Sequence, residues 1–284
     1  MDSLVSTEWL ASELGAADLV VLDASAHLPD AGRDPAAEFV AAHIPGARYL
    51  DLPTLIDPDS PVPSAIPAAG QFAERMRALG VGNGSRVVIY DDSAVKTSAR
   101  AWFIGRLHGM RDIAILDGGL GKWRAERRRL DSGPVETARS DFVAAPGAGT
   151  VRTKTEMLAN LQSRQEQVVD ARSAARFTGE QPDPRPHVPS GHIPGSCNLP
   201  VYDVYHADGT FKDEAGIRAA FAGAGVDLDR PIATTCGGGV TAAVLLFALE
   251  RMGKLDVSLY DGSWSEWAID PETPKAAGPA KLPA

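Results

Sequence analysis

The sequence predicts an α/β protein made of two tandem copies of one domain, each a parallel β-sheet flanked by helices. Three observations support this prediction. The chain has 284 residues, a length that suits two domains of about 140 residues. Motifs of the first half return in the second half in the same order. In both halves, short runs of β-branched residues alternate with helical stretches.

The repeated motifs lie at a nearly constant distance from one another. The distance is 147 residues (170 − 23) between Asp23 and Asp170. It is 149 residues (192 − 43) between His43 and His192, each of which precedes Ile-Pro-Gly. It is 144 residues, as in 230 − 86, in four further pairs: Arg86 and Arg230, Gly109 and Gly253, Asp117 and Asp261, Trp123 and Trp267. Loop insertions between fixed motifs produce such small changes, so we expect two copies of one fold.

Each copy contains a strand–helix–strand unit that can be located from its residues. In the first copy the expected elements are a strand, a helix and a strand over Arg86–Tyr90, Ser98–His108 and Ile113–Leu116. In the second copy they are Pro231–Thr235, Thr241–Met252 and Val257–Tyr260. A glycine follows each helix, which is the usual helix stop. Units of this length predict a parallel sheet with helices on both faces.

The two domains are expected over residues 1–140 and 153–284, joined by a linker over 141–152. The linker is predicted because Ala144–Gly149 consists of alanine, proline and glycine. The tail after Asp270 is rich in proline, alanine, glycine and lysine, so we expect it to be loosely held.

Charge and composition argue against several classes of protein. Apolar residues make up 44% of the chain, charged residues 23%, and the formal net charge is −9. This balance is that of a globular protein, and the negative charge disfavours nucleic acid as a partner. The longest apolar stretch, Val240–Leu249, is too short to span a membrane. Met1–Leu4 lacks the features of a signal peptide, and the chain has only two cysteines. We therefore expect a cytoplasmic protein with no metal site.

The strongest candidate site follows the strand that ends at Thr235. The loop reads Cys236-Gly237-Gly238-Gly239-Val240-Thr241 and leads directly into a helix. Ligands bind parallel sheets at such strand ends. Consecutive glycines let successive N–H groups turn inward to hold an anion, and the helix adds the positive end of its dipole. A cysteine there is favoured as a thiolate nucleophile, whereas Cys197 is interpreted as a buried apolar residue.

The corresponding loop of the first copy has no cysteine. At the distance of 144 residues (236 − 92), Asp92 occupies the position of Cys236. A carboxylate there cannot act as a sulfur nucleophile, so the first domain is predicted to be catalytically silent.

These motifs together resemble the tandem-domain rhodanese superfamily, from about Val5 to Trp267. Within it, 3-mercaptopyruvate sulfurtransferases resemble Cys-Gly-Ser-Gly-Val-Thr-Ala, and Cys236–Ala242 matches this at six of seven positions. Thiosulfate sulfurtransferases carry a bulky basic pair after the cysteine instead. The segment Arg176–Arg185 also resembles the mercaptopyruvate type, in which both terminal arginines hold the substrate.

The resemblance implies a double displacement without metal or organic cofactor. Cys236 takes sulfur from 3-mercaptopyruvate held by Arg176 and Arg185, and pyruvate leaves. The persulfide is held by the N–H groups of residues 237–241 and the Thr241 hydroxyl. Cyanide, a thiol or thioredoxin then accepts the sulfur. Guanidinium groups suit a carboxylate because they bind it in bidentate fashion, while Arg172 is interpreted as the ion-pair partner of Asp170.

Two positions depart from the family pattern, and one histidine keeps two interpretations. The family has serine at Gly238, as one member of a Ser–His–Asp proton relay, and tryptophan at Ala26. The relay therefore cannot exist in that form, and His43 or water has to supply the proton. The recurrence of His-Ile-Pro-Gly favours a structural turn for His192. For His43, both a structural and a catalytic role stay open.

Three other functions are considered. Thiosulfate sulfurtransferase chemistry is the nearest, although the uncharged Gly237–Gly239 loop argues against it. A cysteine phosphatase needs an arginine where this chain has Ala242. A persulfide-carrier or interaction module would accept sulfur from a partner without turning over small molecules, and the departures at Gly238 and Ala26 leave room for it.

Overall fold

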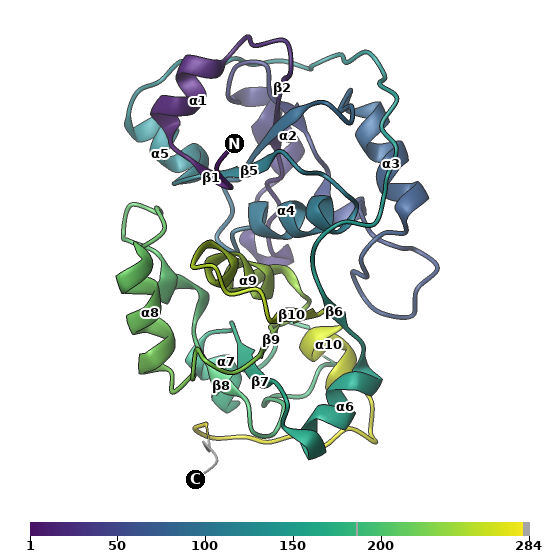
Figure 1. The fold of residues 1–284 in the computed structure, drawn as a ribbon, viewed down its shortest axis with the longest axis vertical. Coiled ribbons are helices and arrows are strands. Elements are labelled where there is room, and N and C mark those ends of the chain that lie inside the picture. Colours follow the sequence, from purple (N-terminus) through teal and green to yellow (C-terminus); the bar gives the residue numbers. More distant parts are fainter. Residues whose placement is uncertain (186, 281–284) are drawn as a thin grey trace. The chain divides into compact units, whose positions relative to one another are not determined.

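The computed structural model describes residues 1–185 and 187–280, and it divides into two compact units (Figure 1). The first unit comprises Met1–Pro58, Ile66–Ala148 and Ala207–Phe211, and the second comprises Asp59–Ala65, Gly149–His206 and Lys212–Ala284. Each unit contains one five-stranded sheet with helices around it, and every strand pair is parallel. The predicted α/β class is confirmed.

The first unit has strand order β1-β5-β4-β2-β3, with β4 in the centre. Its strands are β1 Leu4–Val5, β2 Leu19–Asp23, β3 Arg48–Tyr49, β4 Arg86–Tyr90 and β5 Ile113–Leu116. Its helices are α1 Thr7–Glu13, α2 Pro35–Ala41, α3 Ala69–Ala78, α4 Ser98–Leu107 and α5 Gly119–Ala125, with 3-10 turns at Pro29–Ala31 and Leu52–Thr54. The β-branched runs become buried strands because both faces of the sheet are covered.

The second unit has the corresponding order β6-β10-β9-β7-β8, with β9 in the centre. Its strands are β6 Val151–Arg152, β7 Gln167–Asp170, β8 Cys197–Asn198, β9 Ile232–Thr235 and β10 Val257–Tyr260. Its helices are α6 Lys154–Ser163, α7 Ala174–Thr178, α8 Glu214–Gly223, α9 Val240–Arg251 and α10 Ser263–Trp267, with a 3-10 turn at Val201–Val204. The equal strand orders show that the sequence repeat is a repeat of the fold.

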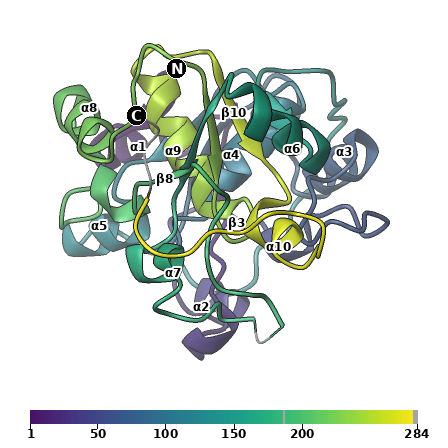
Figure 2. The same ribbon diagram turned by 90° about the horizontal axis from the view of Figure 1, so that it is seen from below.

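Helix α9 is the most deeply buried helix of the second unit. All residues from Ala242 to Leu249 are buried, and the helix packs against β9 and β10 (Figure 2). This explains the longest apolar stretch of the sequence, which is a core helix. Among residues 1–185 and 187–280, the structure contains no helix of the length and apolar character that a membrane crossing requires.

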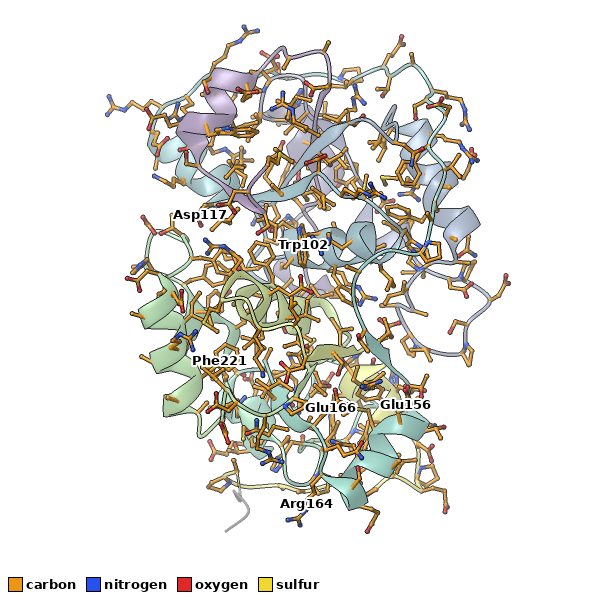
Figure 3. All side chains as sticks on the ribbon, viewed as in Figure 1. Trp102, Asp117, Glu156, Arg164, Glu166 and Phe221 are labelled. Carbon is orange, nitrogen blue, oxygen red and sulfur yellow. The ribbon has the colours of Figure 1, made fainter. Side chains whose placement is uncertain are left out.

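Residues at both ends of the expected linker belong to the units. Phe142 is buried in the first unit, where its carbonyl accepts a hydrogen bond from Arg77 Nε at 2.8 Å. Val151 and Arg152 form the edge strand β6. Arg152 donates to Glu166 at 2.8 Å and to Glu156 at 3.2 Å, two carboxylates labelled in Figure 3. The segment that joins the units is therefore shorter than 141–152.

The prediction of a loose tail after Asp270 is wrong for residues up to Gly278. The indole N–H of Trp267 donates to Pro274 O at 2.8 Å, and Ala276 exchanges two backbone hydrogen bonds with His192. The N–H of Gly278 donates to Thr178 O at 2.8 Å. The tail is held through its backbone groups, which composition does not reveal.

A buried ion pair closes the end of β7 in the second unit. The guanidinium of Arg172 donates to Asp170 with a shortest N–O distance of 2.6 Å, and both side chains are 2% exposed. Arg172 also donates to Gly191 O at 2.8 Å and lies over the ring of Trp264. The expected pairing of Arg172 with Asp170 agrees with this geometry.

We expect Arg172→Ala to lower the free energy of unfolding of the second unit by about 3–5 kcal/mol, because Asp170 is left charged and buried. Urea titration followed by tryptophan fluorescence measures the loss. Arg218→Ala is the matched control, since Arg218 forms an exposed pair with Glu214 whose removal costs less than about 1 kcal/mol. Equal losses in the two variants would contradict a stabilising role for the buried pair.

Candidate active site

The structure places Cys236 at the carboxyl end of the central strand of the second sheet. It follows β9 directly, and the loop 237–239 leads into α9. Cys236 is 2% exposed. Gly239 has a φ of 79°, a left-handed conformation in which a side chain is strained. The loop therefore reverses direction where the helix starts.

The first turn of α10 holds the two carbonyl groups at the start of this loop. Trp264 N donates to Cys236 O at 3.0 Å, and Ser265 N donates to Gly237 O at 2.9 Å. The Ser263 hydroxyl accepts from Cys236 N at 3.2 Å and donates to Tyr260 O at 2.8 Å. These bonds turn the carbonyl groups toward α10 and away from the interior of the loop.

The N–H groups that follow are left without acceptors. Throughout residues 1–185 and 187–280, the backbone N–H groups of residues 237–241 donate no hydrogen bond to the protein. Some of these groups are in the first turn of α9, where the helix itself cannot satisfy them. Together with the dipole of α9 they form a site suited to an anion or a negative sulfur beside Cys236.

The corresponding loop of the first unit differs by one residue from the expected alignment. Tyr90, the last residue of β4, and Thr235, the last residue of β9, accept the same backbone hydrogen bond at 2.9 Å from the residue after β2 or β7. The next residue in the first unit is Asp91, so Asp91 and not Asp92 occupies the position of Cys236. The prediction that placed Asp92 there is corrected. It failed because the strand pairing matches Tyr90 with Thr235, an offset of 145 residues (235 − 90), whereas the repeated motifs predicted 144.

Asp91 fills its own loop with a carboxylate. Its Oδ1 accepts from Ser93 N at 2.9 Å and its Oδ2 from Ser98 N at 2.8 Å, and the residue is 6% exposed. Asp92 instead pairs with Arg33 and Arg124, each at 3.0 Å. In the first unit two N–H groups at this loop thus donate to a carboxylate of the loop itself.

Two arginines and one aspartate form a cluster next to the cysteine loop. Arg176 Nη2 donates to Asp183 Oδ2 at 2.8 Å, while Arg185 donates through Nε to Oδ1 at 2.8 Å and through Nη2 to Oδ2 at 3.0 Å. The Asp183 side chain is 1% exposed, against 20% for Arg176 and 33% for Arg185. Burial by itself raises the pKa of Asp183, but the hydrogen bonds from Arg185 and Arg176 outweigh it and lower the pKa to about 2.

Both guanidinium groups lie beside Gly237. Arg185 donates to Gly237 O through Nη1 and Nη2, each at 3.2 Å. A Cβ atom on Gly237 would lie 3.2 Å from Arg176 Nη2 and 3.5 Å from Arg185 Nη2. A Cβ atom on Gly238 would make only ordinary contacts, the nearest with Ser265 Oγ at 3.8 Å. The structure therefore brings the predicted residues Cys236, 237–241, Arg176 and Arg185 together in the second unit.

Asp183 was missed in the analysis of the sequence. In the sequence, its position between the two arginines, two residues before Arg185, could have indicated it. Two neighbouring guanidinium groups repel each other, so a carboxylate between them is favoured as a counter-charge. That signal is weak without the structure, because an acidic residue close in sequence to arginine is common on protein surfaces.

The two histidines have the same environment in their respective units. His43 Nδ1 bonds Phe39 O at 2.7 Å and its ring stacks on Phe39, while His192 Nδ1 bonds Phe177 O at 2.9 Å and stacks on Phe177. Both are 2% exposed. This equivalence favours the structural interpretation of His43, which belongs to the first unit.

The remaining thiol is placed differently from Cys236. Cys197 lies in β8, is 5% exposed, and burial raises its pKa. Within the described residues, no group of three or more histidine, cysteine, aspartate or glutamate side chains is arranged to hold a metal ion.

Two repeated parallel sheets, one with a cysteine in a glycine loop at the end of its central strand, define a tandem-domain α/β protein with a thiol-based site. The family model of the Rhodanese-like domain matches residues 6–126 and 153–270. The chain belongs to this family. The resemblance found in the sequence is confirmed.

Known relatives agree with this assignment over nearly the whole chain. The 3-mercaptopyruvate sulfurtransferase of Homo sapiens is 41% identical over 93% of this chain and 91% of its own length. The protein of the same name from Escherichia coli strain K12 is 38% identical, with 95% and 96% covered. The crystal structure of SseA from Escherichia coli has 37% identity and a TM-score of 0.84, with 94% of this chain and 100% of SseA covered.

We expect Ser263→Ala to lower the free energy of unfolding of the second unit by about 1–3 kcal/mol, because the buried Cys236 N–H loses its acceptor. Denaturant titration measures it. Ser265→Ala is the matched control, since Ser265 Oγ donates to Gly262 O, which also accepts from Glu266 N. An equal or larger effect of the control would contradict the role of Ser263 at the loop.

Proposed function

We propose that this protein is a sulfurtransferase that takes sulfur from 3-mercaptopyruvate, releases pyruvate, and passes the sulfur to a thiol or to cyanide. The observation that carries the proposal is the position of the Arg176 and Arg185 guanidinium groups beside Gly237. Gly237 follows Cys236, which is the one cysteine among the described residues that is next to a loop with unbonded N–H groups. Relatives named 3-mercaptopyruvate sulfurtransferase, 38–41% identical to this chain, support it.

The carboxylate of the donor would bind the two arginines. Arg176 uses Nη2 for Asp183, and its Nε is buried without a hydrogen-bond partner in the described part of the chain. A guanidinium presents a planar fork of N–H donors, so Arg176 retains donors for a carboxylate. Arg185 is more fully engaged, because it also holds Gly237 O. Because the arginines lie beside Gly237, binding there would bring the donor's thiol toward Cys236.

Sulfur transfer then proceeds without a cofactor. The Cys236 thiolate attacks the donor sulfur, an S–S bond forms, and the C–S bond breaks with its electron pair on carbon. The carbon becomes the enolate of pyruvate, and the proton it needs is the one lost from the donor sulfur. The products are pyruvate and an ionised Cys236 persulfide, so atoms and charge balance. Since Gly238 offers no hydroxyl, water carries that proton in the proposed mechanism.

The loop would stabilise the persulfide and present it to the acceptor. The N–H groups of residues 237–241 and the Thr241 hydroxyl are donors for the negative outer sulfur. A thiol, thioredoxin or cyanide attacks that sulfur, and the Cys236 thiolate leaves. We propose that the first unit is catalytically silent, because Asp91 is a carboxylate where Cys236 is a thiol. The cytoplasmic location stays a prediction.

Thiosulfate is the second candidate donor. The same arginines and N–H groups suit any small anion, and a thiosulfate sulfurtransferase of Cricetulus griseus is 36% identical over 97% of this chain and 96% of its own length. The loop residues Gly237–Gly239 carry no charge of their own, which favours the carboxylate donor over a sulfur oxyanion.

Steady-state kinetics with two donors tests the proposal. We expect kcat/KM for pyruvate formation from 3-mercaptopyruvate to exceed that for thiocyanate formation from thiosulfate and cyanide by a factor of about 100, or about 2.7 kcal/mol of transition-state discrimination. A preference for thiosulfate would transfer the assignment to the second candidate. Loss of both activities would favour a persulfide carrier, recognised by sulfur loading that depends on a partner protein.

We expect Cys236→Ala to lose more than about 99% of turnover with an unchanged fold, because the nucleophile is removed. Mass spectrometry after treatment with donor should show one added sulfur atom on the wild-type chain and none on the variant. Cys197→Ala is the matched control and should retain both activity and sulfur loading. Turnover by Cys236→Ala above a few per cent would rule out the persulfide mechanism.

A further inference from the structure

Asp183 is a buried carboxylate that no step of the proposed mechanism uses. It lies between Pro182 and Pro184, whose rings restrict the backbone on either side. Its Oδ1 accepts from the backbone N–H of Arg185 at 3.0 Å as well as from the Arg185 side chain. One carboxylate therefore determines both the course of this segment and the direction of a guanidinium.

The same carboxylate joins the two arginines into one unit. Its two oxygens accept three side-chain hydrogen bonds from Arg176 and Arg185, between 2.8 and 3.0 Å. The carboxylate is hidden while both guanidinium groups remain partly exposed. A donor arriving from solvent would meet the arginines, with Asp183 behind them.

Charge bookkeeping at this cluster leaves one positive charge. Arg176 and Arg185 contribute two positive charges, and Asp183, which is ionised at neutral pH, cancels one of them. The repulsion between Asp183 and a donor is proportional to the negative charge of the donor. A dianion is therefore repelled twice as strongly as a monoanion at the same distance. Asp183 therefore reduces the attraction of the arginine pair for a dianion by twice as much as it reduces the attraction for a single carboxylate.

We propose that Asp183 is a positioning and specificity-determining residue, which orients Arg176 and Arg185 and makes the site prefer a donor with one carboxylate over the doubly charged thiosulfate ion. This inference rests on the proposed function and names what sets its donor preference. Asp183 acts through the arginines, since its own oxygens face them. Fixed guanidinium groups hold the donor in one orientation, which is worth more to a planar carboxylate than to a tetrahedral oxyanion.

Asp183→Asn tests the proposal with little change of shape. The remaining oxygen can still accept from the Arg185 N–H, but the charge is lost and the amide group opposes one guanidinium. We expect KM for 3-mercaptopyruvate to rise about tenfold while kcat changes by less than about threefold, because a binding and not a reacting group is disturbed. We expect KM for thiosulfate to stay constant or fall, so the donor ratio shifts about tenfold or more toward thiosulfate.

Two further variants separate this role from a general effect on structure. Asp227 makes the same turn contact, its Oδ1 accepting from Asp229 N at 2.9 Å, and is exposed on another loop of the second unit. Asp227→Asn should leave both KM values and the donor ratio unchanged. Asp183→Glu keeps the charge but displaces it, so its donor ratio should lie closer to that of the wild type than to that of Asp183→Asn.

The outcomes distinguish this inference from the proposed function. If the wild type prefers 3-mercaptopyruvate but a folded Asp183→Asn keeps the donor ratio within about twofold, the inference is overturned and the proposed function stands. If the wild type forms no pyruvate, the proposed function fails and the donor preference inferred for Asp183 fails with it. If Asp183→Asn does not fold, Asp183→Ser, which also removes the charge, decides, and a folded Asp183→Ser with an unchanged donor ratio would overturn the inference.

Discussion

The chemistry of this protein depends on where the first carbonyl groups of the cysteine loop point. Trp264 N donates to Cys236 O, and Ser265 N donates to Gly237 O. The Ser263 hydroxyl accepts a hydrogen bond from Cys236 N. With these groups bound to α10, the N–H groups of residues 237–241 are the polar groups left for an anion. The glycines permit this conformation, but the hydrogen bonds from α10 select it.

The two units carry different side chains at the same position of one scaffold. Both present a loop at the end of the central strand, and both anchor its first carbonyl from a helix start, with Leu120 N bound to Asp91 O as Trp264 N is bound to Cys236 O. In the first unit the Asp91 carboxylate accepts hydrogen bonds from the N–H groups of Ser93 and Ser98. The second unit has a thiol at that position, which leaves the N–H groups available.

An anion site in an acidic chain requires local control of charge. The net charge of −9 works against anionic donors at long range, and the Arg176–Arg185 pair reverses this next to Gly237. Asp183 holds the pair together and limits its charge. The same cluster thus attracts the donor and discriminates between donors, since the carboxylate that orients the guanidinium groups also lowers their net positive charge.

Much of the fold was determined by the sequence alone. The bounds of β4, β5 and β10 agree with those expected from their β-branched runs, and the cysteine–glycine loop was recognised from its residues, because strand patterning and glycine conformations are local properties. Tertiary structure decided what depends on contacts between distant segments. The strand pairing shows that Asp91, and not Asp92, corresponds to Cys236. The tail forms backbone hydrogen bonds with His192 and Thr178, and Asp183 pairs with both arginines. Register, backbone pairing and burial of a charge arise only when the chain is folded, because each requires a partner that the local sequence does not contain.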